Sequence, residues 1–306
     1  MHLPRLAVVA LTGPTYRLSL HHRLSVRMQR WLSEVGAGLL RPPRGTQVEH
    51  IELGGRSAER VTVGASHRPR AVLYLHGGGY VVGSARMYRA LAGYLARVSG
   101  AVVFTLDYRL APEHVYPAAL DDAVAAFRTL VAEHGFDAAR IAVAGDSAGG
   151  GLAVAAARRL TDDGLRPGAL ALLSPWTDPS DHDMPLRDFV VNQAWGTSCA
   201  ELYRGSADPL DPGYAPMHAN LRGLPPMAIH TAKAEMLNAQ VKRFAARAEA
   251  AGGDVALIEL PTLWHSGHVL AGLLRESTQA VHDVGTYLRA CLDVDADMSL
   301  SARQPG

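Results

Sequence analysis

The short run 145–149, Gly-Asp-Ser-Ala-Gly, constrains the fold more than any other part of this chain. An apolar, strand-like run at 141–144 leads into it, and a helix-forming run at about 150–161 leads out of it. A serine at such a strand-to-helix turn has a strained backbone, which small neighbouring residues must permit. Ser147 would therefore project its hydroxyl group beside the positively polarised N-terminus of the helix. For the pentapeptide alone, a glycine-rich turn with no chemical role is the alternative interpretation.

A second glycine-rich motif, His-Gly-Gly-Gly at 76–79, follows the apolar run 71–75. An enzyme that transfers acyl groups through a serine needs N–H donors directed at the developing oxyanion, and glycines let backbone amides approach it closely. One donor comes from the residue after the serine and the others from such a loop. The candidate donors are the N–H groups of Ala148, Gly78 and Gly79. Together the two motifs favour a reactive serine site over a plain turn.

The rest of the chain alternates between strand-like and helical runs. Strands are expected at 48–53, 58–63, 71–75, 102–106, 141–144, 169–173, 227–230 and 255–260. Helices are expected near 85–98, 118–134, 150–161, 238–251 and 275–291. This alternation predicts an α/β fold in which helices cover both faces of a largely parallel sheet. Functional loops are then expected at the carboxyl ends of the strands.

Two segments depart from the alternation: 1–40 is amphipathic and helical, and 176–225 is rich in turn-forming residues. We expect them to form a cap over the strand ends. The expected division is an N-terminal cap segment (1–45), a first core part (46–177), a cap insertion (178–222) and a second core part (223–306). The apolar side chains of the first segment are expected to pack inward and to line the substrate pocket. They are Leu24, Met28, Trp31, Leu32 and Val35.

Composition excludes several classes of function. The 306 residues carry a net charge of only +1, which gives no electrostatic reason to bind nucleic acid or an acidic membrane. Apolar runs are too short for stable membrane insertion, and the run 6–11 is short for a signal peptide. Cys199 and Cys291 are far apart, which fits a reducing, cytoplasmic location better than a disulfide framework. No zinc-type motif is present, so neither a metal nor another cofactor is expected.

A nucleophilic serine needs a histidine base, and that histidine needs a carboxylate to fix its tautomer. The strand-like run 255–260 is followed by a loop that contains His265 and His268, either of which could be the base. The run 227–230 is followed by a loop whose only carboxylate is Glu235. Glu235 is therefore the expected acid.

These motifs together resemble the hormone-sensitive-lipase-like branch (bacterial family IV) of the α/β-hydrolases, carboxylesterases that carry HGGG and GDSAGG. The resemblance covers nearly the whole chain and implies an eight-stranded, mostly parallel central sheet flanked by helices, with a helical cap. The matching segments are 75–80, 107–114, 117–122, 145–150, 174–176 and 223–226.

The resemblance also implies roles for individual residues. Ser147 falls at the nucleophile, Glu235 at the acid and His265 at the base of the family, while Gly78, Gly79 and Ala148 fall at its oxyanion donors. Tyr80, Trp176 and Trp31 are candidates for substrate binding.

The chain also departs from the family pattern at three places, one of which is a short cap insertion. The usual acid is aspartate, whereas this chain has Glu235, with Ala239 at the place of a second aspartate. The usual His-Gly-Phe is His-Ser-Gly at 265–267, with His268 following. Branches that use this glutamate include lactone and acetyl-ester hydrolases.

The expected function is a serine carboxylesterase that acts on short- to medium-chain acyl esters. A lactone hydrolase, an amidase and an acyltransferase use the same three residues and remain alternatives. A ligand-binding receptor is a further alternative, as in the plant gibberellin receptors, but these lack the catalytic histidine and this chain retains His265. The expected partner is a small ester or lactone, and the sequence is compatible with a monomer or a homodimer.

Overall fold

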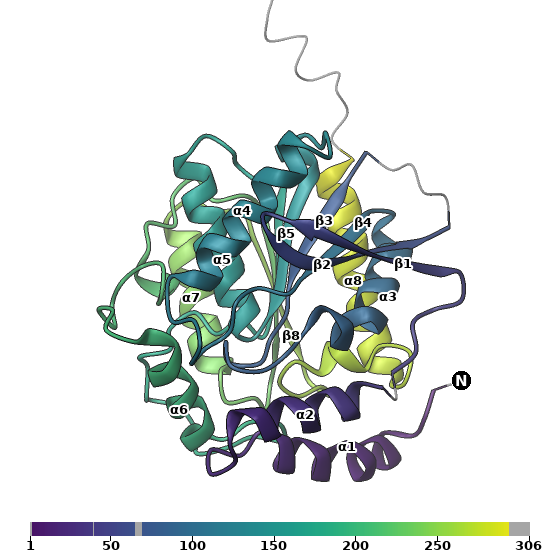
Figure 1. Cartoon of the computed structure of the whole chain (residues 1–306), viewed down its shortest axis with the longest axis vertical. Coiled ribbons are helices and arrows are strands. Elements are labelled where there is room, and N and C mark those ends of the chain that lie inside the picture. The colour runs from purple at the N-terminus through teal and green to yellow at the C-terminus, as the bar shows by residue number, and fades with distance from the viewer. Residues whose placement is uncertain (1, 39, 65–68, 294–306) are drawn as a thin grey trace, which may run out of the picture.

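The computed structural model describes residues 2–38, 40–64 and 69–293. Within these residues the strands form one eight-stranded sheet in the order β1-β2-β4-β3-β5-β6-β7-β8 (Figure 1). β1 and β2 are antiparallel to each other, β2 is antiparallel to β4, and all the other pairs are parallel. The strands are β1 (Thr46–Leu53), β2 (Arg56–Val63), β3 (Ala71–Leu75), β4 (Val102–Leu106), β5 (Ile141–Asp146), β6 (Ala169–Leu173), β7 (Met227–Ala232) and β8 (Val255–Leu260).

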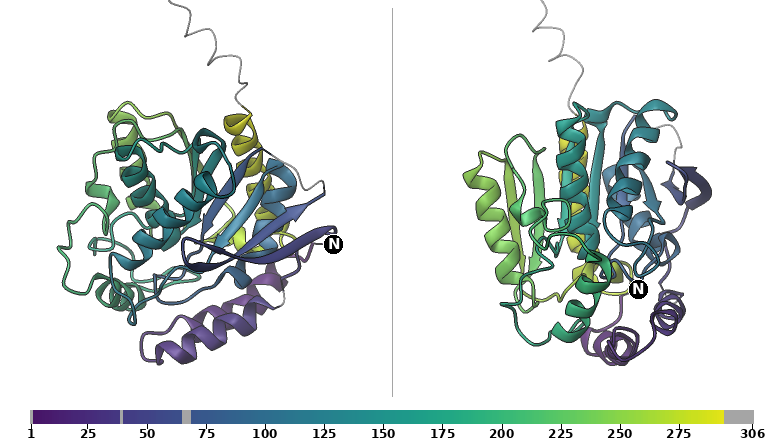
Figure 2. Two further views of the ribbon diagram at one scale, coloured as in Figure 1. Left: turned by 45° about the horizontal axis from the view of Figure 1, so that its top comes forward. Right: turned by 60° about the vertical axis from the view of Figure 1, so that its left-hand side comes forward.

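Helices cover both faces of this sheet (Figure 2). α3 and α8 pack against one face, and α4, α5 and α7 pack against the other. The helices are α1 (Arg5–Ser19), α2 (Val26–Ala37), α3 (Arg89–Ser99), α4 (Ala118–Ala132), α5 (Ala148–Asp162), α6 (Gln193–Arg204), α7 (Asn238–Ala250) and α8 (Arg275–Leu292). This is the α/β arrangement that the alternating pattern predicted. The predicted helix at 85–98 begins with a 3-10 turn, η1 (Ala85–Tyr88), before α3.

The strands in the middle of the sheet bury both of their faces. All five residues of β3 are buried, and they alternate between two cores. Leu73 packs in the core that contains Phe127 of α4, whereas Val72 and Tyr74 pack in the core that contains Leu95 of α3. Continuous apolar runs of this kind are what a parallel sheet covered on both faces requires.

Two strands extend beyond their apolar runs. β5 and β7 each continue two residues farther than predicted, to Asp146 and Ala232. Asp146 can be buried in a strand because its carboxylate accepts hydrogen bonds from the Tyr74 and Tyr88 hydroxyls and from the Gly77 N–H. A hydropathy pattern misses such residues, because their partners come from elsewhere in the chain.

α1 and α2 lie side by side at one end of the molecule, where the chain leaves β5 (Figures 1 and 2). α6, from the 178–222 insertion, lies near them. The division of the chain into cap and core parts at 45, 177 and 222 stays a prediction. Residue 1, residue 39 and residues 65–68 and 294–306 of these parts lie outside the described residues.

The predicted orientation of α2 is wrong. Met28, Trp31 and Val35 point outward, with exposed fractions of 45%, 60% and 59%. Gln29 is buried instead, because its side chain donates to the Leu24 carbonyl and accepts from the Trp195 indole at 2.8 Å. Inter-element hydrogen bonds therefore outweigh the apolar pattern in orienting this helix, and Trp31 faces away from the substrate pocket.

Candidate active site

Ser147 lies at the junction of β5 and α5 in the strained conformation that its motif predicted. Its φ is 50° and its ψ is −122°, in a region that non-glycine residues rarely adopt. The neighbouring glycines permit it: a Cβ atom at Gly149 would clash with the Leu75 carbonyl, and one at Gly145 would clash with Gly149. The side chain of Ser147 makes no helix-capping bond, which leaves its hydroxyl group available to the loops opposite.

His265 and Glu235 complete a hydrogen-bonded chain with this serine. His265 Nε2 lies 2.9 Å from Ser147 Oγ, and His265 Nδ1 lies 3.1 Å from Glu235 Oε2. Because a carboxylate only accepts, Nδ1 carries the proton, and the unprotonated Nε2 faces the serine hydroxyl. All three side chains are buried. The loops after β5, β7 and β8 thus bring together residues that are 118 and 30 positions apart.

The local turn after β7 accommodates the longer side chain of Glu235. Its Oε1 accepts hydrogen bonds from the Thr231 hydroxyl at 2.6 Å and the Ala232 N–H at 3.1 Å. These bonds fold the side chain back toward its own strand and leave Oε2 for the histidine. The glutamate therefore reaches the imidazole while its remaining lone pairs stay satisfied.

The charge of Glu235 tunes the imidazole. Burial disfavours the charged form of His265, but the hydrogen bond and the charge of Glu235 outweigh burial, so the pKa of His265 lies above its ordinary value. Asp188 and Asp146 act in the same direction at longer range. An imidazole held in this way can accept a proton readily and remain stable once charged.

The two glycine-rich motifs leave three backbone N–H groups available to a ligand. In the described part of the chain, the N–H groups of Gly78, Gly79 and Ala148 have no hydrogen-bond partner. The two glycines have φ values of 115° and 62°, and a Cβ at Gly79 would lie 2.9 Å from Cys199 Sγ. Only glycine fits there, which is why the loop can present its backbone to a ligand.

The Asp146 carboxylate holds this glycine loop in place. It accepts from the Gly77 N–H at 2.9 Å and from the Tyr74 and Tyr88 hydroxyls at 3.0 Å each. Burial raises the pKa of Asp146, and these hydrogen bonds oppose the rise. The sequence analysis missed this bracing role. The only sequence feature that could have indicated this role is the position of the Asp146 carboxylate directly before Ser147. No sequence feature indicated that Tyr88 would be its partner.

His268 does not face the serine. Its Nε2 lies 3.1 Å from Nδ1 of His230 on β7, and both side chains are buried. Burial lowers the pKa of His268 well below its ordinary value and that of His230 to about 4. The pair is therefore neutral at physiological pH. Of the two candidate bases, the structure brings only His265 to Ser147.

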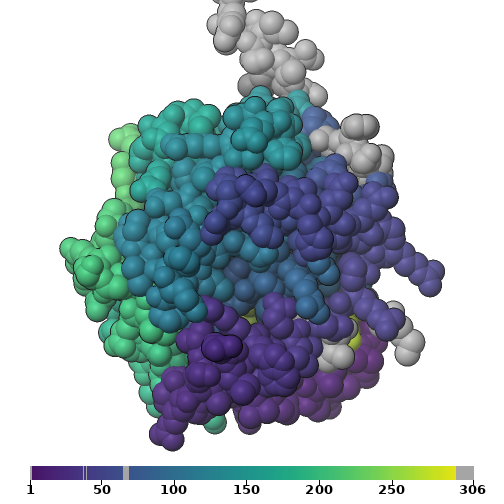
Figure 3. All heavy atoms as spheres, in the orientation of Figure 1, coloured from purple at the N-terminus to yellow at the C-terminus, as the bar shows by residue number. Residues whose placement is uncertain are grey.

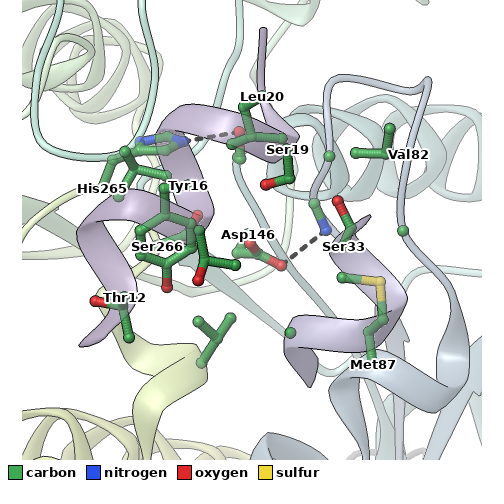
Figure 4. A pocket seen from close by; sticks show the side chains of 18 of the residues that line it. Thr12, Tyr16, Ser19, Leu20, Ser33, Val82, Met87, Asp146, His265 and Ser266 are labelled. Atoms are coloured by element: carbon green, nitrogen blue, oxygen red, sulfur yellow. Dashed lines mark hydrogen bonds between the residues drawn. The ribbon is translucent and has the colours of Figure 1, made fainter. Parts of the chain in front are cut away.

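Two cavities meet at Ser147 and His265. The larger, of about 170 Å³, lies between the glycine loop and the cap helices, with Tyr16, Ser19 and Ser33 in its wall (Figure 4). The smaller, of about 30 Å³, lies beside α6 and the loop 176–184. A substrate whose carbonyl carbon lies at Ser147 would therefore direct one of its two carbonyl substituents into each cavity.

The structure corrects part of the predicted substrate contacts. Trp176 lines the smaller cavity. Tyr80, however, is only 2% exposed and stacks on Tyr203 at 3.7 Å between ring centroids. It therefore packs in the core and does not line either cavity. Trp31 is exposed on the outside of α2. The cap side chains that reach the larger cavity are a mixture of polar ones, such as Thr12 and Tyr16, and apolar ones, such as Leu11, and the predicted stripe of α2 is not among them.

Within residues 2–38, 40–64 and 69–293, no group of three or more His, Cys, Asp or Glu side chains is arranged to hold a metal ion. No helix in these same ranges is both long enough and apolar enough to cross a membrane.

Comparisons with known proteins agree with this geometry. A family model described as the alpha/beta hydrolase fold matches residues 72–269. An esterase from the bacterial hormone-sensitive lipase (HSL) family has a similar structure, with a TM-score of 0.87 and 35% identity, over 95% of this chain and 100% of that one. This chain belongs to the hormone-sensitive-lipase-like α/β-hydrolases.

Relatives in this family have named activities. An acetyl-hydrolase of Streptomyces hygroscopicus is 39% identical over 226 residues, 72% of this chain and 75% of the relative. Esterase LipU of Mycobacterium tuberculosis is 32% identical over 269 residues, 83% of this chain and 90% of the relative.

Proposed function

We propose that this hormone-sensitive-lipase-like hydrolase is a serine carboxylesterase for short- to medium-chain acyl esters. Relatives and structural neighbours are esterases and acetyl-hydrolases, and the chain is a carboxylic-ester hydrolase. The observation that carries the proposed mechanism is the continuous hydrogen-bonded chain from Ser147 through His265 to Glu235. Its supports are the strained conformation of Ser147 and the unpartnered N–H groups of Gly78, Gly79 and Ala148.

In the first half-reaction, Nε2 of His265 removes the hydroxyl proton as Ser147 Oγ attacks the ester carbonyl carbon. The carbonyl oxygen becomes an oxyanion facing the N–H groups of Gly78, Gly79 and Ala148, each donor being worth about 2.7–4 kcal/mol in systems of this kind. Glu235 stabilises the imidazolium. The C–O bond to the alcohol then breaks, and the alcohol leaves with the proton from Nε2.

In the second half-reaction, water takes the place of the alcohol. Nε2 of His265 removes a proton from the water as it attacks the acyl-enzyme on Ser147. The oxyanion forms again at the same donors, the bond to Oγ breaks, and the serine recovers the proton from His265. The carboxylic acid is released, and the enzyme returns to its starting state.

The two cavities suggest how an ester would be divided. The larger has apolar walls from Leu11, Leu20, Val190 and Leu273, which suit an acyl chain. The smaller carries Asp181, His182 and Gln193, which suit a small alcohol and incoming water. A cavity of roughly 150 Å³ can hold a six-carbon ring, so about 170 Å³ fits a chain of roughly that size.

A serine-directed phosphonate should label one residue, Ser147, in proportion to the loss of activity. The reagent mimics the tetrahedral intermediate and needs both an activated nucleophile and oxyanion donors. Peptide mass spectrometry locates the adduct, and a parallel series of 4-nitrophenyl esters, lactones and anilides identifies the leaving group. Labelling elsewhere with full inactivation contradicts the mechanism, and faster turnover of lactones or anilides redirects the substrate class.

Changing Ser33 to leucine should shift the preferred 4-nitrophenyl ester toward shorter acyl chains by roughly two carbons, because close-packed interiors do not absorb added methylenes. Ser33 lines the larger cavity, and its hydroxyl is buried without a partner, so no hydrogen bond is lost. The control is Val35→Leu on the outer side of the same helix. The measurement is kcat/KM against chain length. Superimposable profiles would place the acyl chain elsewhere.

A further inference from the structure

We propose that the outer face of α1 and α2 docks on an anionic lipid surface and brings the mouth of the larger cavity to it. The proposal concerns binding, and only the route to Ser147 rests on the proposed function. We call this surface the cap face. Its large apolar side chains, with their exposed fractions, are Leu6 (84%), Leu11 (48%), Leu18 (60%), Met28 (45%), Trp31 (60%) and Val35 (59%).

Apart from Leu6, the apolar side chains of the cap face lie on one side of their helix. Met28, Trp31 and Val35 are spaced at i, i+3 and i+7 along α2, and Leu11 and Leu18 are seven residues apart on α1. Seven of the twelve exposed large apolar side chains in the described residues precede residue 38. The cap helices form most of the lower part of the molecule in the view of Figure 3. Exposed apolar groups gathered in this way mark an interaction site.

The positive charge of residues 1–45 favours an anionic partner. Residues 1–45 contain seven arginines and one glutamate, a net charge of +6 in a chain whose total is +1. Arg17, Arg23 and Arg27 are exposed, and none has a carboxylate partner in the described part of the chain. An apolar helical face edged by free arginines is the pattern of a helix that lies in the interface of an anionic lipid layer.

A second copy of the chain is a poorer occupant. A symmetric dimer through this surface would place the same face against itself, so two arginine-rich segments would meet. A lipid layer matches both the apolar and the cationic character. α1 and α2 have 15 and 12 residues, too short to span a bilayer, so they would lie along its surface.

The cap face is continuous with the larger cavity. The inner sides of the same two helices supply Thr12 and Tyr16 from α1 and Gly36 from α2 to the cavity wall. Leu11 belongs to both surfaces, since it lines the cavity and is half exposed. An acyl chain that leaves a lipid layer beneath the cap face would therefore enter the cavity past Leu11 and reach Ser147.

Vesicle flotation of the full chain tests the proposal. The protein carries Ser147→Ala, so that no lipid is hydrolysed during the experiment. The result therefore reports binding alone and does not depend on whether the proposed esterase function is correct. We expect binding to vesicles of phosphatidylcholine with 30% phosphatidylglycerol, at least tenfold tighter than to pure phosphatidylcholine and weakened by salt. Equal affinity for the two compositions, or no binding to either, overturns the proposal.

Three variants assign the binding to the cap face. Leu18→Ser with Trp31→Ser should reduce affinity at least tenfold, and Arg17→Gln with Arg23→Gln should remove the preference for anionic vesicles. Leu210→Ser is the matched control, because Leu210 is 55% exposed but outside the cap face. Thermal melting verifies that each variant is folded. A loss as large in the control, or a dimer that becomes monomeric with Trp31→Ser, contradicts lipid docking.

Tryptophan fluorescence gives an independent readout. The other three tryptophans, Trp176, Trp195 and Trp264, are at most 6% exposed, so a blue shift on vesicle binding would come from Trp31. Trp31→Leu keeps the apolar surface, so this variant should still float with the vesicles but lose the shift. Binding of the unchanged chain without a blue shift would show that a different surface meets the lipid.

Discussion

Replacing Ser147 with alanine should lower kcat for ester hydrolysis roughly 10⁴- to 10⁶-fold and leave the melting temperature nearly unchanged. The nucleophile would be lost, whereas the fold would lose little, because the side chain of Ser147 caps no helix and its hydroxyl meets only His265 among the described residues. Alanine has the same backbone strain as serine at this φ. The measurements are steady-state kinetics and thermal melting on the same preparation.

Ser99→Ala is the control for this experiment, because it should change stability and leave activity unchanged. Ser99 is fully buried on α3, and its hydroxyl donates to the Leu95 carbonyl at 2.7 Å and accepts from the Ala101 N–H at 3.2 Å. Its replacement should lower stability by about 1 kcal/mol and leave kcat unchanged. If Ser147→Ala retains comparable turnover at matched purity, or loses activity only in step with its stability, the serine mechanism is refuted.

The sequence predicted best those parts of the molecule where backbone geometry demands particular residues. The strained turn at Ser147 and the loop at Gly78 each require glycines where a Cβ would clash, and such demands are local enough to read from a motif. Glu235 was selected as the expected acid by its place after a strand, because parallel strands deliver their following loops to one edge of the sheet, and the structure places it in hydrogen-bond contact with His265. The structure adds how Thr231 folds this longer acid back.

The sequence predicted least well those features that depend on partners far along the chain. Burial of Gln29 depends on Trp195, 166 residues away, and α2 is oriented by that bond rather than by its own apolar stripe. The same is true of Asp146, whose hydroxyl partners lie 58 and 72 residues away. The apolar side chains of α2 that were predicted to be buried, Met28, Trp31 and Val35, are exposed and form part of the cap face. A failed burial prediction thus identified a surface with its own proposed role.

Replacing His265 with alanine should cost roughly 10⁴- to 10⁶-fold in kcat, and replacing His268 should cost far less activity but more stability. The first change removes the only imidazole that hydrogen-bonds to Ser147 among the residues that the structure describes. The second leaves buried His230 without its 3.1 Å partner, at a cost of about 1–3 kcal/mol in the free energy of unfolding. Kinetics and urea unfolding on both variants separate the two effects. Loss of activity in the His268 variant with retention in the His265 variant would reverse the assignment.

The pH profile of the unchanged enzyme gives this prediction its second readout. Only neutral His265 can accept the serine proton, so kcat/KM should fall as the pH falls through the pKa of this histidine in the free enzyme. Because Glu235 raises that pKa above its ordinary value, the midpoint should lie above about 6.5. Glu235→Gln removes the stabilising charge but keeps the shape, so the midpoint should move to lower pH as kcat declines. A midpoint unmoved by this change would mean that another group governs the acid limb and that Glu235 does not act through His265.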